Sequence, residues 1–122
     1  MKPKSIYIAG PMTGVPYFNF PLFFKAADRY RDAGFRVFNP AEADIKRHGG
    51  VDISKDNPTG DPKLAAANHN FDLGQALRED TEFICLHATH ICMLPGWENS
   101  KGARAEHALA HALGHTILYW QE

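Results

Sequence analysis

The sequence predicts an α/β fold, namely a single-domain, three-layer α/β/α sandwich around a parallel sheet of four to five strands. Two observations indicate this fold. Short β-rich apolar runs alternate with stretches whose apolar residues recur at helical spacing, and Gly-Pro, Asn-Pro and Pro-Gly pairs end the apolar runs. With 122 residues, of which 44% are hydrophobic and 22% charged, residues 1–122 are expected to form one globular domain.

The first half of the chain contains a predicted βαβ unit. Residues 5–9 (SIYIA) form a short apolar run that ends at a Gly-Pro pair, which is typical of a buried strand followed by a loop. A helix is expected to begin near Asn19 and to end at Gly34. Residues 35–38 (FRVF) predict a second strand. Because the connections are short, the two strands should be parallel, with a right-handed crossover.

The second half repeats this alternation. The pattern predicts a helix over 71–86, a strand over 90–94 (HICML), a helix over 103–113 and a last strand over 116–120 (TILYW). Such an order is typical of a flavodoxin- or Rossmann-like sheet, whose ligands bind at the carboxyl ends of the strands. The three loops that follow the first three strands should therefore share one edge of the sheet.

The stretch from about 42 to 70 differs from the rest. It contains HGG, DNP and TGDP, has few apolar residues and shows no sustained period. We therefore expect a long loop or insertion at about 42–70. A loop of this length inside a small domain is usually functional or mobile, so a substrate-side lid and a tolerated surface excursion both stay open.

Composition excludes several partners. The net charge is -1 and the chain has no Lys/Arg run, so neither a nucleic-acid polymer nor an anionic membrane is an expected partner. No apolar run approaches the roughly 20 residues of a membrane-spanning helix, and the apolar run near the start is too short for a signal peptide. The two cysteines are expected to be reduced thiols in a cytoplasmic protein.

The stretch PGWENSKGARAE, residues 95–106, has the composition of an anion-binding loop followed by a helix. Gly102 would let the backbone approach a ligand, and Ser100 and the free N–H groups of the helix would suit a phosphate. The helix dipole predicts an ionised Glu106, which could attack or stabilise the oxocarbenium-like C1′ of a breaking N-glycosidic bond. Spacing alone favours a solvated helix acid and an ordinary loop glycine, because a glycine-rich loop before a helix is a weak motif.

Three motifs together resemble a known superfamily. They are YIAGPMTG (7–14) with NFP (19–21), FNPAE (38–42) and LPGWENSKGARAEHALA (94–110). The chain resembles the nucleoside 2-deoxyribosyltransferase-like superfamily, and most closely its small, often phage-encoded branch. A similar proline- and glycine-rich loop before a helix glutamate occurs in the cytokinin-activating phosphoribohydrolases, which also cleave nucleotides. The resemblance implies a role in nucleotide metabolism.

The resemblance also implies roles for individual residues. Glu106 matches the glutamate nucleophile that forms a ribosyl-enzyme ester. Asp80 matches the aspartate that holds or protonates the leaving base, with Asp72 as the alternative. The first-strand motif would line the sugar and base pocket, together with the loops after the other strands. The expected substrate-binding residues are Tyr7, Gly10, Pro11, Met12, Asn39, Gly96, Trp97, Ser100 and Gly102.

One position separates two kinds of substrate. The nucleoside transferases tend to carry an aspartate six residues before the nucleophile, whereas nucleotide-hydrolysing relatives tend to have a serine there and a glycine two residues later. This chain has Ser100 and Gly102 before Glu106. A hydroxyl and N–H groups donate to a 5′-phosphate that a carboxylate would repel. The site is therefore expected to prefer a nucleoside 5′-monophosphate, with Lys101 or Arg104 adding positive charge at the rim.

The expected activity is cleavage of the N-glycosidic bond of a nucleoside 5′-monophosphate or nucleoside, by hydrolysis or by transfer of the sugar. The alternative is a non-catalytic nucleotide-binding or sensing module, and cleavage of a nicotinamide or cyclic nucleotide is a third possibility. Relatives are oligomers in which a neighbour's residues enter the site, so a homo-oligomer (a dimer or tetramer) is expected.

Neither a metal nor another cofactor is expected. Two groups of residues have the types of metal ligands, but the first lacks a carboxylate or cysteine to complete a site. The second includes a cysteine inside a buried strand, where a thiol usually packs as a small apolar group. Trp97 could stack on a base or sugar, or simply pack. The two groups are His107, His111 and His115, and Cys85, His87, His90 and Cys92.

Overall fold

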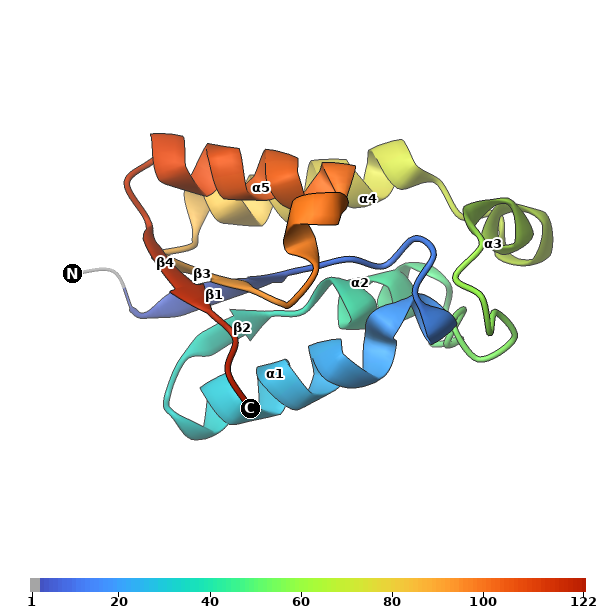
Figure 1. The fold of residues 1–122 in the computed structure, drawn as a ribbon, viewed down its shortest axis with the longest axis horizontal. Coiled ribbons are helices and arrows are strands. Elements are labelled where there is room, and N and C mark those ends of the chain that lie inside the picture. The colour runs from blue at the N-terminus through green and yellow to red at the C-terminus, as the bar shows by residue number, and fades with distance from the viewer. Residues whose placement is uncertain (1–2) are drawn as a thin grey trace.

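The computed structural model describes residues 3–122, and this part of the chain forms four strands and five α-helices (Figure 1). Two short 3₁₀ helices, η1 and η2, precede α1 and α5. The strands are β1 (Ser5–Ala9), β2 (Arg36–Phe38), β3 (His90–Met93) and β4 (Thr116–Tyr119); the helices are η1 (Pro16–Asn19), α1 (Phe20–Asp32), α2 (Pro40–Arg47), α3 (Pro62–His69), α4 (Leu73–Leu86), η2 (Trp97–Asn99) and α5 (Lys101–Ala112).

The four strands form one parallel sheet in the order β2-β1-β3-β4. Tyr7 in the centre of β1 pairs with Phe38 on one side and with Ile91 on the other. The chain thus moves outward from β1 to β2 and then crosses to β3 and β4 on the opposite side. The point where the strand order reverses lies between β1 and β3, and in open α/β sheets ligands bind beyond the carboxyl ends of the strands at this point.

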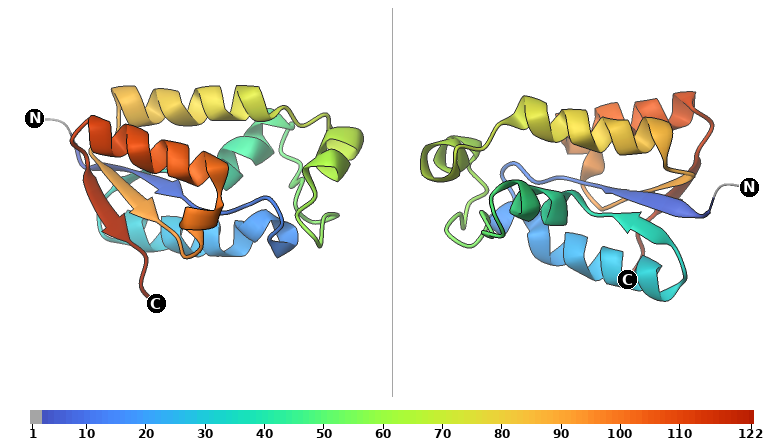
Figure 2. Two further views of the ribbon diagram at one scale, coloured as in Figure 1. Left: turned by 45° about the horizontal axis from the view of Figure 1, so that its top comes forward. Right: turned by 180° about the vertical axis from the view of Figure 1, so that it is seen from behind.

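The sheet is covered on both faces, which confirms the predicted α/β sandwich. α1 lies against one face, and α4 and α5 lie side by side on the other (Figures 1 and 2). Ile6 and Ile8 of β1 point to the α1 side and pack with Phe23, whereas Tyr7 points to the opposite core with Ile84. A strand buried on both faces needs apolar residues in succession, which explains the continuous SIYIA run.

The region predicted as a long loop or insertion at about 42–70 differs from that prediction, because it contains α2 and α3. Asn39 caps α2 by accepting a hydrogen bond from the Ala41 N–H at 2.9 Å, and Asp61 caps α3 by accepting one from the Lys63 N–H, also at 2.9 Å. A proline opens each helix, where its fixed φ is favourable. Capping signals thus define the start of both helices; α2 also has an apolar face with Ala41 and Ile45 in the core, whereas α3 has no such face.

The connection between α2 and α3 is fastened to the loop that follows β1. The Gly14 N–H donates to the Gly60 carbonyl at 2.8 Å, and the Tyr17 N–H donates to the Asn57 carbonyl at 3.1 Å. Figure 1 shows this region beyond the carboxyl ends of the strands, with α3 at the far end of the molecule. The two connections therefore form one unit beside the end of the sheet where ligands are expected.

The loop after β1 carries an unusual backbone. Tyr17, Phe18 and Asn19 are three successive non-glycine residues with φ of 54°, 53° and 62°. Each such residue costs of order 1 kcal/mol and persists only where the surroundings hold it. Here the Phe18 side chain is buried in the α1-side core. Asn19 precedes α1, as predicted, but its side chain makes no capping hydrogen bond because its own backbone is left-handed.

The close approach at Gly60 generates a stability prediction. A Cβ at Gly60 would collide with the backbone O and N of Val15, whereas one at Gly49 would meet nothing within 4 Å, although both glycines have φ of +69°. Gly60→Ala should therefore destabilise the fold by about 1–3 kcal/mol more than Gly49→Ala. Urea denaturation of the two variants measures this difference. Equal losses would show that the two connections are not held together at this point.

Candidate functional site

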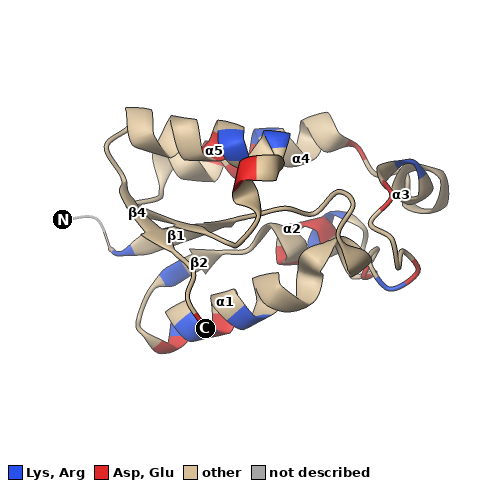
Figure 3. Ribbon diagram, viewed as in Figure 1, with Lys and Arg blue, Asp and Glu red and all other residues tan. Residues whose placement is uncertain are grey.

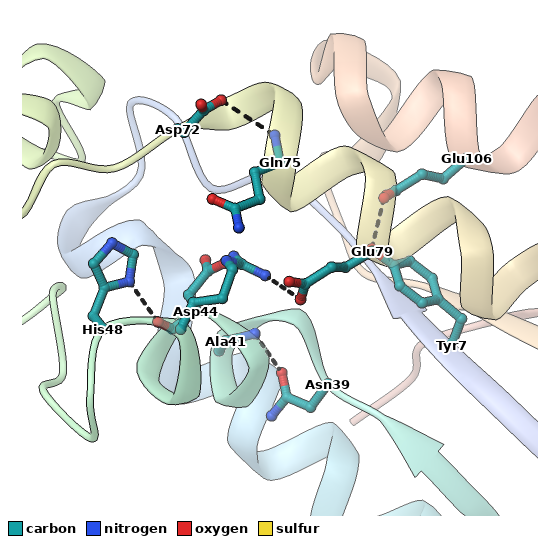
Figure 4. Close-up of polar contacts among 10 residues, drawn as sticks. Tyr7, Asn39, Ala41, Asp44, His48, Asp72, Gln75, Glu79 and Glu106 are labelled. Atoms are coloured by element: carbon teal, nitrogen blue, oxygen red, sulfur yellow. Dashed lines mark hydrogen bonds and ion pairs between the residues drawn. The ribbon is translucent and has the colours of Figure 1, made fainter.

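Tyr7 places a hydroxyl group inside the core between the sheet and the α4/α5 layer. Its side chain is 1% exposed, and its ring stacks on Phe38 with centroids 5.6 Å apart. The hydroxyl donates a hydrogen bond of 2.6 Å to Oε2 of Glu106, which is 5% exposed (Figure 4). Glu106 on α5 thus points inward to the central strand, and the hydroxyl group of the buried Tyr7 holds its carboxyl group there.

Asp80 on α4 completes a group of three buried polar side chains. It is 7% exposed, and its charge acts on both Tyr7 and Glu106, so the two carboxyl groups are neighbours. Within residues 3–122, Oδ1 of Asp80 has no hydrogen-bond partner. A buried carboxyl oxygen without a donor is costly and calls for a proton or a ligand.

Burial dominates the protonation of this group. It raises the pKa of Glu106 to about 8, with a further increase from the charge of Asp80, while the Tyr7 hydrogen bond opposes the shift. Burial likewise raises the pKa of Asp80 to about 7, against the effects of the nearby Tyr7 hydroxyl and of Arg47. Burial and the two carboxylates raise the pKa of Tyr7 well above 10, so the phenol stays a donor. The two acids are coupled and share protons as a pair near neutral pH.

The prediction that the helix dipole keeps Glu106 ionised is therefore wrong for the protein without ligand. Glu106 lies in the second turn of α5, and the favourable effect of a helix N-terminus fades within the first turn. Burial and the charge of Asp80 act in the opposite direction and raise the pKa of Glu106 to about 8. An ionised Glu106 needs a partner beyond Tyr7.

The loops after β1 and β3 meet at the reversal point of the sheet, as the topology predicts. A Cβ at Gly10 would lie 2.7 Å from Leu94 Cβ, and one at Gly96 would lie 3.3 Å from Pro11 Cγ. Gly96 also has φ of +86°. The glycines at both positions are thus explained by the close contact of the two loops, and Pro11 is part of that contact.

Ser100 and Gly102 form the beginning of α5. Ser100 is the N-cap, and its Oγ accepts a hydrogen bond from the Ala103 N–H at 3.2 Å. The N–H groups of a first helical turn have no intrahelical acceptor. Those of Lys101 and Gly102, between Ser100 and Ala103, can therefore bind an anion. A Cβ at Gly102 would only touch Leu77, at 3.9 Å. Packing therefore gives no reason for a glycine here.

Three other predicted substrate-binding residues have structural contacts instead. Both polar groups of the Asn39 side chain are used inside the protein, one as the cap of α2 and the other as a donor to the Phe23 carbonyl at 3.3 Å. Met12 packs against the α1-side core. Trp97 stacks on His107, with centroids 4.3 Å apart, which corresponds to the packing alternative.

The choice between the two candidate aspartates is clear from their positions. Asp72 is exposed and caps α4 by accepting a hydrogen bond from the Gln75 N–H at 3.2 Å. Asp80 lies in the buried group with Tyr7 and Glu106. The structure therefore places Asp80, and not Asp72, beside the predicted nucleophile.

Sequence reasoning missed a partly buried ion-pair network next to these acids. Arg47 on α2 pairs with Asp44 on the same helix and, at 2.7 Å, with Glu79 on α4. Its side chain is 11% exposed, and its charge lowers the pKa of Asp80. The i, i+3 spacing of Asp44 and Arg47 was the available signal, but it lay in the stretch read as a loop.

The remaining features concern metals, membranes and surface charge. In the part of the chain that the structure describes, no three His, Cys, Asp or Glu side chains are placed to hold a metal ion. Cys92 is buried and accepts a hydrogen bond from the Tyr30 hydroxyl at 3.4 Å, and Cys85 is exposed.

Between residues 3 and 122, no helix has both the length and the apolar character to span a membrane. Figure 3 shows both basic and acidic residues on α1 and α2.

The buried acids predict a pH-dependent stability. Their pKa values in the folded protein lie above the ordinary 3.8 for Asp80 and 4.5 for Glu106, so the folded state binds more protons. The resulting stabilisation is complete below these ordinary values and is lost as the pH rises through about 7 and about 8. Glu106→Gln should consequently be more stable than the parent at about pH 9, by on the order of a few kcal/mol, and nearly equal at about pH 4.

Denaturant titrations at these two pH values measure the difference. Glu98→Gln is a matched control, because Glu98 is exposed in η2 and its replacement should change the free energy of unfolding at neither pH. A Glu106→Gln variant with the same advantage at both pH values would contradict the protonation of the buried pair.

The comparisons with known proteins give one match. A family model described as "Domain of unknown function (DUF4406)" matches residues 4–119. No curated protein and no solved structure matches the chain. The matched stretch includes all four strands and the three buried polar residues Tyr7, Asp80 and Glu106. The chain therefore belongs to the DUF4406 family of domains.

Proposed function

We propose that the protein cleaves the N-glycosidic bond of a nucleoside 5′-monophosphate, with Glu106 as the nucleophile and Asp80 as the acid. The observation that carries this proposal is the buried pair of carboxyl groups at the reversal point of a parallel sheet, with Glu106 held by Tyr7 and Oδ1 of Asp80 without a hydrogen-bond partner. Glycosidases commonly use two carboxyl groups in different environments, one protonated and one ionised.

The first step of the proposed reaction uses one acid in each form, with the proton on Asp80. Because the pKa of Glu106 (about 8) lies above that of Asp80 (about 7) in the folded protein, the bound substrate has to reverse this order. The ionised Glu106 forms a bond to C1′ of the sugar while the bond from C1′ to the base nitrogen breaks, and that electron pair stays with the base. Asp80 gives its proton to the departing base. The Tyr7 hydroxyl, 2.6 Å from Oε2 in the free protein, stabilises the Glu106 charge before the attack. The positive charge that develops at C1′ favours the ionised form that burial alone disfavours.

The second step releases the sugar. The Asp80 carboxylate takes a proton from water as the water oxygen forms a bond to C1′, and the Glu106 ester bond breaks to return a carboxylate. Tyr7 again donates to this carboxylate. If a second base takes the place of water, the same step transfers the sugar.

The beginning of α5 supports a substrate with a 5′-phosphate. The Lys101 and Gly102 N–H groups and the positive end of the helix are available to phosphate oxygens. Glu106 lies on the same helix, one turn further on. A phosphate at the helix N-terminus and a sugar C1′ at Glu106 are therefore compatible with one bound nucleotide.

A Glu106→Gln variant tests the nucleophile. It should keep the fold and the Tyr7 hydrogen bond but lose at least about 10³-fold in the rate of base release, because an amide cannot form the ester. Chromatography of free base after incubation with a panel of nucleoside monophosphates measures the rate, and Glu98→Gln provides the control with parental activity. Unchanged turnover in Glu106→Gln would refute this role, and thermal stabilisation of the parent without any base release would favour a binding module.

A charge placed at the cap of α5 tests the phosphate. Ser100→Asp and Ser100→Asn both preserve a good N-cap, so they differ mainly in charge. Ser100→Asp should weaken binding of a nucleoside monophosphate at least about tenfold relative to Ser100→Asn, because like charges repel, while binding of the free nucleoside should change little. Calorimetric titration gives both affinities. An equal loss for the two ligands would show that the phosphate does not lie at this helix.

A further inference from the structure

A cavity of about 370 Å³ lies between α2, α3 and α4, outside the group of buried acids. Arg47 and His48 line it from the end of α2, and Asp72 and Gln75 line it from the beginning of α4. This volume is at the lower end of the range for small-molecule sites, which suits a flat ring system. Nothing in the catalytic steps above uses these side chains.

The cavity borders the helix that carries Asp80. Gln75 precedes Asp80 by five residues, about 7.5 Å along the helix axis, and shares a helix face with Glu79, four residues further on. Arg47 lines the cavity and also contacts Glu79, the residue next to Asp80. Figure 4 shows Gln75 and Glu79 directed from α4 toward α2, where Asp44 and His48 lie. A base whose sugar C1′ is at Glu106 would therefore extend along α4 toward this cavity.

His48 presents a fixed hydrogen-bond acceptor. Its Nδ1 is 2.6 Å from the Asp44 carbonyl, which can only accept, so Nδ1 carries the proton. The ring also stacks on Phe71, with centroids 6.2 Å apart and planes 19° apart. Burial, with Arg47 and His69 nearby, lowers the pKa of His48 and keeps the ring neutral. In this tautomer Nε2 has a free lone pair.

The charges around the cavity do not favour a phosphate. Arg47 is already paired with Asp44 and Glu79, and Asp72 adds a carboxylate to the lining. Gln75 contributes an amide that can both donate and accept. The cavity thus offers a mixed set of donors and acceptors of the kind that recognises the edge of a heterocyclic base.

We propose that this cavity receives the base of the substrate, and that His48 and Gln75 make it prefer a base with an exocyclic amino group next to a ring nitrogen, such as adenine or cytosine. The inference rests on the proposed function. The amino group would donate to His48 Nε2 or to the Gln75 carbonyl, and the Gln75 amide would donate to a ring nitrogen, as glutamine does with adenine. A base with an oxo group at that position would leave the His48 acceptor unpaired, which costs binding energy.

Binding to the Glu106→Gln variant, which holds substrate without cleaving it, tests the preference. Adenosine 5′-monophosphate should bind at least about tenfold more tightly than inosine 5′-monophosphate, because only the first carries the amino group. Adding Gln75→Leu or His48→Phe should reduce this ratio toward one. Gln75 is exposed and His48→Phe keeps an aromatic ring against Phe71, so both variants should fold. Arg78→Leu, at an exposed position of α4 outside the cavity lining, should leave the ratio unchanged.

The outcomes separate the two proposals. A ratio near one before mutation, a ratio that survives both cavity variants, or no binding of either nucleotide would overturn the base subsite. If either of these ratios is found and the parent enzyme still releases base, the base subsite is wrong but the proposed function is supported. A ratio that depends on Gln75 and His48, without base release by the parent, would support the subsite and refute the enzymatic function.

Discussion

The hydrogen bond from Tyr7 to Glu106 is the interaction on which the site depends. It joins the central strand to α5 across 99 residues of sequence, in a layer from which water is excluded. A buried phenol and a buried carboxyl group are each costly alone and acceptable together, so the bond fixes both side chains. Because Glu106 is directed inward by this contact, it faces Asp80 and not solvent, and the two acids become a coupled pair.

The two cores on either side of the sheet differ in polarity. The core between the sheet and α1 is apolar and contains Phe20 and Phe23, both 1% exposed. The core on the α4/α5 side contains the three polar groups, one with an unsatisfied oxygen. The unfavourable burial of the acids is thus confined to one layer, while the apolar layer stabilises the fold. Such local conflict with the packing rules is expected where a site is kept ready for a ligand.

The parallel sheet, the positions of α1, α4 and α5 between its strands, and the meeting of the loops could be predicted from the sequence. Each of these depends on local periodicity and turn residues. The sequence did not reveal α2 and α3, because each helix has only eight residues and α3 has no apolar face, so neither gives a sustained helical period. It identified Glu106 but not its protonation, because the burial that raises its pKa comes from Tyr7 and Asp80, which are distant in sequence. Arg47 was missed for the same reason, since its partner Glu79 lies on another helix.

The parallel topology determines how the proposed substrate would be oriented in the site. α4 and α5 lie side by side on one face, and each belongs to a crossover that brings its N-terminus toward the carboxyl ends of the strands (Figure 1). The beginning of α5 has free N–H groups and a small residue, Gly102, whereas the beginning of α4 is already capped by Asp72 and borders the polar cavity. A phosphate is therefore favoured at α5 and repelled at α4. In the proposed binding mode, with the phosphate at one helix and the base along the other, the bond between sugar and base would be directed to the acids between them.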